Sequence, residues 1–142
     1  MRSWLTGICA CFCVATVSAQ NLPPVEFYLN TAYMCGGIGS DQAAAFKAAR
    51  SHYPLSLNFG QKLGNKVAFI ADIQVVIRDQ YDQTVVNINS EGPFCLLDMD
   101  YGKYQVYVTY EGQTLHQTIE VKGTGHQLSF IWPEKNTTEL SK

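Results

Sequence analysis

Apolar and polar side chains alternate along most of the chain between positions 53 and 132. The alternating rows lie at 55–59, 73–77, 115–121 and 128–132. Successive side chains of a β-strand point to opposite faces, so this period of two predicts strands with one buried face each. A helix cannot bury such a pattern on one side. The alternation therefore restricts the chain to sheets that pack face to face.

Turn residues separate these rows at short intervals. Turn signals with glycine, proline, serine or aspartate occur at 79–82, 90–93, 100–102, 111–112 and 122–125. Strands of this length with turns about 10 residues apart are typical of antiparallel β-sandwiches. We therefore expect a mostly β protein that forms an antiparallel sandwich.

One segment, CGGIGSDQAAAF at 35–46, resembles neither a strand nor an ordinary turn. We expect a short helix at 41–50, with Ser40 capping its first turn. A phosphate-binding loop is the alternative. The glycine spacing of a dinucleotide loop fails at Gln42, no lysine precedes a serine or threonine as in a P-loop, and Asp41 would repel an anion. The glycines are therefore predicted to form a corner that leads into the helix.

The first residues have the layout of a secretory signal peptide. Arg2 is followed by a short apolar run that ends in small residues, and we expect cleavage between Ala19 and Gln20. A membrane anchor and a lipoprotein signal are the alternatives, but the run is shorter than the roughly 20 residues that span a bilayer. The expected organisation is a signal peptide at 1–19, a lead-in at 20–34, a sandwich at 35–132 and a polar tail at 133–142.

Removal of residues 1–19 leaves two of the five cysteines, Cys35 and Cys95. In an oxidising compartment such a pair indicates one disulfide, which would stabilise the fold by roughly 4 kcal/mol. Two buried free thiols are the alternative. Neither cysteine has further ligands at zinc spacing, so we expect no metal and no cofactor. We expect the protein to be periplasmic or secreted.

Charge limits the classes of partner. Without Arg2 the chain has nine basic and 12 acidic residues, a net charge of −3. No basic cluster is present, so nucleic acid is not an expected partner. We also expect no membrane span in the mature chain.

The segment around Tyr107 is the predicted contact surface. Glycines flank 102–112, and the β-forming residues between them favour a strand in which Tyr104, Val106, Val108 and Tyr110 point inward. Tyr107 then faces outward with Gln105 and Thr109. The alternative is an ordinary aromatic residue on a half-exposed sheet.

Histidines provide the only candidate acid–base or metal pair. His116 is expected on an outer face and His126 in a glycine-containing loop. If the last two strands form a hairpin, the two side chains approach each other. Two solvated histidines are the alternative, and we assign them no metal.

The run GPFCLLDMDYGKYQVYVTYEG at 92–112 resembles the signature of carboxypeptidase regulatory-like (transthyretin-like) domains. The matching positions are Gly102, Tyr104, Val106, Tyr110 and Gly112, whereas Asp100 and Tyr101 replace the usual prolines of the turn. CGGIGSDQAAAF, YPLSLNF and ADIQVVIRD resemble a group of small exported proteobacterial proteins that carry this domain behind a short helix.

This resemblance covers about residues 33–132 and implies a seven-stranded sandwich in the periplasm or outside the cell. It supplies no activity. The hydroxyisourate hydrolases of the same fold end in a Tyr-Arg-Gly-Ser signature, whereas this chain ends in ELSK.

The sequence thus predicts a non-catalytic exported interaction module that binds a protein or a cell-envelope component. Two alternatives remain open. One is a small periplasmic hydrolase or metal-dependent enzyme that uses His116 and His126, and the other is an inhibitor of an exported enzyme.

Overall fold

A computed structural model describes residues 22–135, so the expected signal peptide and its cleavage site lie outside the described residues. The described part contains ten strands, one α-helix and one short 3₁₀ helix. In chain order the elements are β1 (Glu26–Tyr28), β2 (Thr31–Gly36), α1 (Ser40–Ala49), η1 (Arg50–His52), β3 (Leu55–Leu63), β4 (Lys66–Phe69), β5 (Ile73–Asp79), β6 (Thr84–Ser90), β7 (Phe94–Asp98), β8 (Gly102–Tyr110), β9 (Gln113–Val121) and β10 (His126–Trp132).

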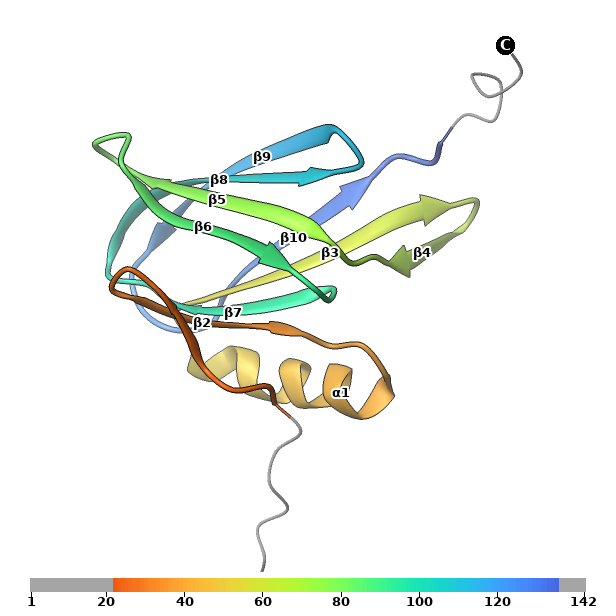
Figure 1. The fold of residues 1–142 in the computed structure, drawn as a ribbon, viewed down its shortest axis with the longest axis horizontal. Coiled ribbons are helices and arrows are strands. Elements are labelled where there is room, and N and C mark those ends of the chain that lie inside the picture. Colours follow the sequence, from red (N-terminus) through yellow and green to blue (C-terminus); the bar gives the residue numbers. More distant parts are fainter. Residues whose placement is uncertain (1–21, 136–142) are drawn as a thin grey trace, which may run out of the picture.

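The strands form two sheets that face each other. The larger sheet has the order β1-β2-β7-β3-β10, with β4 also paired to β3, and the smaller sheet has the order β6-β5-β8-β9. Figure 1 shows the two layers, with α1 lying against the outer side of β2 and β7. The expected β-sandwich with one short helix is therefore confirmed at this level.

The main core lies between the two sheets, where the alternating rows meet. Leu57, Val75, Val106 and Phe130 are representative, each no more than 1% exposed. Burial of one such side chain contributes about 1.5–3 kcal/mol. The period-two alternation of the sequence is thus the pattern that fills the space between the layers.

Two features of the sheet differ from the expectation. There are ten strands rather than about seven, because β1, β2 and β4 are short or lack a clear alternation. The sandwich is also not wholly antiparallel. β10 runs parallel to β3, with His126 opposite Leu55 and Trp132 opposite Gln61.

The edges of β9 and β10 are joined by side chains. The indole Nε1 of Trp132 donates to the Gln113 carbonyl at 2.9 Å, and Gln117 Nε2 donates to the Ser129 carbonyl at 2.8 Å. The two strands belong to different sheets and form no hairpin ladder. These bonds satisfy polar groups at the open side of the sandwich.

The helix begins one residue earlier than expected and lacks the expected cap. Gly39 occupies the N-cap position with φ 88° and no side-chain cap, and Ser40 is the first helical residue. Ser40 as the capping residue was therefore wrong, because the positive φ at the cap position favours glycine. Phe46 anchors the helix by packing on Phe94 at 6.0 Å between ring centroids.

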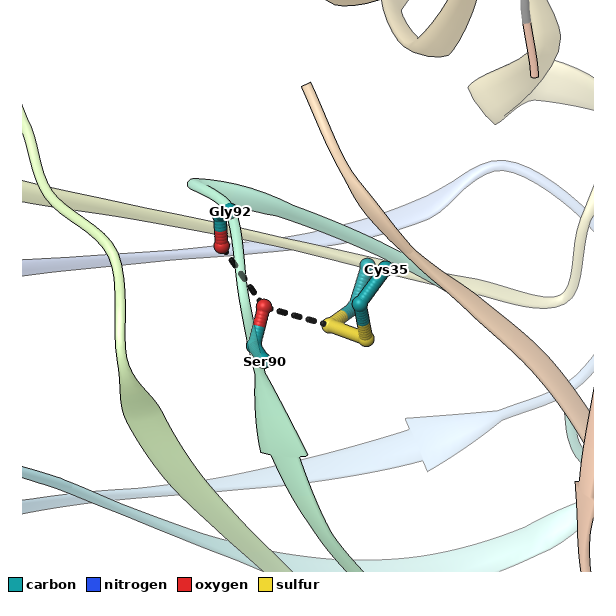
Figure 2. The surroundings of a disulfide bond; sticks show 4 residues. Cys35, Ser90 and Gly92 are labelled. Atoms are coloured by element: carbon teal, nitrogen blue, oxygen red, sulfur yellow. Dashed lines mark hydrogen bonds between the residues drawn. A yellow bond between two sulfur atoms is a disulfide. The ribbon is translucent and has the colours of Figure 1, made fainter. Parts of the chain in front are cut away.

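The disulfide connects β2 to β7 within the larger sheet. Cys35 and Cys95 are directly opposite each other in the register of these strands, and their sulfurs are bonded. Figure 2 shows the bond beside Ser90, whose buried hydroxyl donates to the Gly92 carbonyl at 2.6 Å. Because Cys95 is 0% exposed, the bond lies in the core rather than at the surface.

Candidate interaction surfaces

Strand β8 places its alternate side chains as the sequence predicts. Tyr104, Val106 and Val108 are buried, whereas Gln105 is exposed and Tyr107 and Thr109 are partly exposed. The outward residues lie near the middle of the smaller sheet, because β8 has β5 on one side and β9 on the other. A central position gives these residues a backbone held by two ladders.

Tyr107 is fixed by neighbours from both adjacent strands. Its ring stacks on the imidazole of His116, its direct partner on β9, with 4.5 Å between centroids and 17° between planes. The guanidinium carbon of Arg78 on β5 lies 5.8 Å from the Tyr107 centroid, within cation–π range. Three strands therefore contribute to one row of cationic and aromatic groups.

Polar groups beside this row are also held in place. The Tyr107 hydroxyl donates to Gln105 Oε1 at 2.6 Å, and the hydroxyls of Thr109 and Thr114 lie 2.7 Å apart. We name these residues the Tyr107 surface: Arg78, Gln105, Tyr107, Thr109, Thr114 and His116. The sequence identified Gln105, Tyr107 and Thr109, but Arg78 and Thr114 emerge only from the cross-strand register.

The two candidate histidines have separate environments. His116 stacks on Tyr107 on the outer face of the smaller sheet, whereas His126 begins β10 in the larger sheet. The Nε2 atom of His126 accepts a hydrogen bond from the Lys122 amide at 3.1 Å. The condition for their approach, a hairpin of the last two strands, is therefore not met, because β9 and β10 belong to different sheets. Within residues 22–135, no group of three or more His, Cys, Asp or Glu residues is placed to hold a metal.

The glycine-rich segment forms a corner between β2 and α1. The Gly37 amide, with φ 97°, donates to Gln42 Oε1 at 2.7 Å. In a phosphate-binding loop such amides are free to donate hydrogen bonds to the ligand. Here the Gly37 amide already donates to the side chain of Gln42 in the following helix. Figure 1 shows the segment running from the end of β2 to the start of α1.

Tyr104 lines a pocket of about 410 Å³ together with residues of β5, β8 and β9. Its hydroxyl donates to the Asp100 carbonyl at 2.8 Å. Burial raises the pKa of this phenol above its ordinary value, and the negative charges of Asp100 and Asp79 raise it further. Tyr104 therefore stays protonated at neutral pH and acts as a structural hydrogen-bond donor.

A groove between α1 and β4 was not identified from the sequence. It has a volume of about 510 Å³ and is lined by Ile38, Ala43, Ala44, Lys47, Phe69 and Pro93, among others. Ile38 and Phe69 are 68% and 55% exposed. The signal that would have located it is Gly64-Asn65, a two-residue turn between apolar runs that predicts the β3–β4 hairpin.

No protein-family model matches the chain, and no curated protein matches it. The resemblance to carboxypeptidase regulatory-like domains therefore stays a prediction. None of the helices described between residues 22 and 135 is long and apolar enough to span a membrane.

Proposed function

We propose that this protein is an exported, non-catalytic interaction module whose Tyr107 surface binds another protein or a cell-envelope component. The observation that carries the proposal is the row of Arg78, Tyr107 and His116 across β5, β8 and the edge strand β9, in which Tyr107 stacks on His116 and lies within cation–π range of Arg78. Exposed aromatic and arginine side chains are enriched at binding hot spots. Here they are already ordered, so binding costs little side-chain entropy.

Export is supported by the basic and apolar start of the sequence and by the Cys35–Cys95 disulfide. Disulfides persist mainly in oxidising compartments such as the periplasm and the cell exterior. We place the protein in the periplasm or outside the cell, as a carboxypeptidase regulatory-like domain of the transthyretin-like type.

The absence of catalysis is supported by the placement of the two histidines. An acid–base or metal pair needs both side chains within reach of one substrate atom. His116 contacts Tyr107 on the smaller sheet. His126 lies on the larger sheet, where its Nε2 atom accepts a hydrogen bond from the Lys122 amide.

The test is capture of partners from a periplasmic extract by immobilised wild-type protein, Tyr107→Ala and Tyr101→Ala. Tyr101 is 73% exposed but lies outside the Tyr107 surface, so it is the matched control. We expect one enriched partner with wild type and Tyr101→Ala and its loss with Tyr107→Ala. Equal recovery with all three proteins, or no enrichment with any, contradicts the proposal.

A further inference from the structure

The larger sheet has an outer face that α1 covers only in part. The helix packs on β2 and β7 through Phe46, Phe94 and Leu96. Beyond the end of β7, β4 takes its place beside β3: Asn58 pairs with Phe94 of β7, and Gly60 pairs with Phe69 of β4. Figure 1 shows β4 extending past the first turn of α1. Among the described strands, β4 pairs with β3 alone.

The free edge of β4 presents unused backbone groups. The Ile70 amide donates to the Phe59 carbonyl at 3.3 Å, so the backbone groups of Ile70 point toward β3. Hydrogen-bonded pairs alternate with non-hydrogen-bonded ones in an antiparallel ladder, so Val67 and Phe69 direct their N–H and C=O groups away from β3. An added strand would hydrogen-bond to these two residues, in line with β2 along the sheet.

The side chains of the same two residues lie on the helix side of the sheet, where Phe69 lines the groove. Phe69 contacts Phe94 with 5.1 Å between ring centroids, which places it on the helix side of the sheet. Val67 lies on the same side, because a Cβ added to Gly60 would meet its Cγ1 atom. Val67 and Phe69 are 49% and 55% exposed. Backbone groups and apolar side chains are thus available together.

Lys47 in the groove lining and Lys62 on the same face of the sheet carry positive charge. Lys47 of α1 holds its Nζ atom 5.5 Å from the centroid of Phe69. Lys62 is the direct cross-strand partner of Val67, so its side chain lies on the same face. The ion pairs found among residues 22–135 involve neither lysine. In a chain with a net charge of −2, two unpaired lysines beside exposed apolar residues fit a partner that supplies carboxylates.

From these observations we propose that the groove binds an extended, acidic and apolar segment of a partner protein as an additional β-strand along β4. Apolar side chains at alternate positions contact Ile38, Val67 and Phe69, and a carboxylate pairs with Lys47 or Lys62. Strand addition derives affinity from backbone hydrogen bonds and specificity from alternate side chains. This site is distinct from the Tyr107 surface and does not depend on it.

Two other occupants fit less well. β4 carries Lys66, and lysine on an edge strand opposes pairing with a second copy through that strand. An anionic membrane matches the lysines and the apolar residues but leaves the outward N–H and C=O groups of Val67 and Phe69 unused.

The test measures binding by fluorescence anisotropy, with a labelled synthetic peptide of about eight residues that alternates valine and glutamate. Three control peptides carry lysine in place of glutamate, a scrambled order, or N-methyl groups on alternate backbone nitrogens. We expect the alternating peptide to bind and each control to bind at least about tenfold more weakly, because each loses backbone bonds, apolar register or charge complementarity.

Variants locate the site. Val67→Pro removes the outward amide without affecting the β3 ladder, and Val67→Ala shortens the side chain but keeps the amide. We expect Val67→Pro to weaken binding by about tenfold more than Val67→Ala. Lys47→Glu should weaken binding of the glutamate peptide, whereas Lys103→Glu on the smaller sheet and Tyr107→Ala should leave it unchanged.

Several results would overturn the proposal. They are no saturable binding of the alternating peptide to wild-type protein, equal binding of its N-methylated form, and equal affinity in Val67→Pro and Val67→Ala. Binding of phosphatidylglycerol vesicles that Lys47→Glu abolishes, without peptide binding, would assign the groove to a membrane. A dimer in sedimentation that Val67→Pro disrupts would assign it to a second copy. The peptide controls use wild-type protein, so they remain decisive if a variant fails to fold.

Discussion

Removal of the Cys35–Cys95 disulfide should lower the free energy of unfolding by about 4 kcal/mol. The two cysteines are 60 residues apart, and the magnitude follows from the entropy that the unfolded chain regains when a loop of this length opens. Alanine at both positions is the appropriate replacement. Cys95 is 0% exposed, so a serine there would place a hydroxyl in the core.

The folded state should survive this change, because the β2–β7 ladder continues on both sides of the disulfide and α1 packs on its outer face. We expect the Cys35→Ala, Cys95→Ala variant to unfold at lower urea concentration, followed by the fluorescence of buried Trp132. Its m-value should be larger, since an unfolded chain without the cross-link exposes more surface.

Reduced wild-type protein is the matched control. It should unfold near the double variant, and dithiothreitol should not affect the variant. A loss of less than about 1 kcal/mol in the double variant would refute the chain-entropy reasoning.

Three further predictions concern packing, pH and metal. Gly92→Ala should destabilise the fold by more than about 2 kcal/mol in urea unfolding, because an added Cβ would collide with the backbone of Gly36. A urea midpoint equal to that of the wild-type protein would contradict this close approach. Because the pKa of Tyr104 is raised in the folded state, its contribution to stability is complete below pH 10 and is lost as pH rises through the folded pKa. Tyr104→Phe should therefore reduce the loss of stability at alkaline pH, measured by unfolding at a series of pH values. An alkaline loss of stability that is unchanged in Tyr104→Phe would argue against burial of Tyr104 as the cause of that loss. Purified protein should contain no stoichiometric metal by elemental analysis, and an ion that disappears in His116→Ala would favour the enzyme alternative.

Alternation predicted the parts of the fold in which one face of a strand is buried. The rows ending at Phe59 and Trp132, and the outward position of Tyr107, follow from sequence because a period of two assigns each side chain to a face. β2 and β7 were harder to interpret. They are covered by the smaller sheet on one side and by α1 on the other, so consecutive residues such as Phe94 and Cys95 are both buried.

Partner strands were not predictable from local pattern. The apolar row at 128–132 was recognised, but its parallel pairing with β3 joins residues about 70 positions apart and leaves no local signal. The same limit applies to both surfaces. Tyr107 was identified from its own strand, whereas its contacts with Arg78 and His116, and the alignment of Lys47 with Phe69, depend on packing.

The Tyr107 surface is the binding site that we propose for this protein. Site-specific photo-crosslinking tests it most directly, with a photoreactive phenylalanine analogue in place of Tyr107 or, as a control, of Tyr101, in cells that export the protein. We expect one discrete cross-linked partner from position 107 and none from position 101. The same adducts from both positions, or none from either, would contradict it.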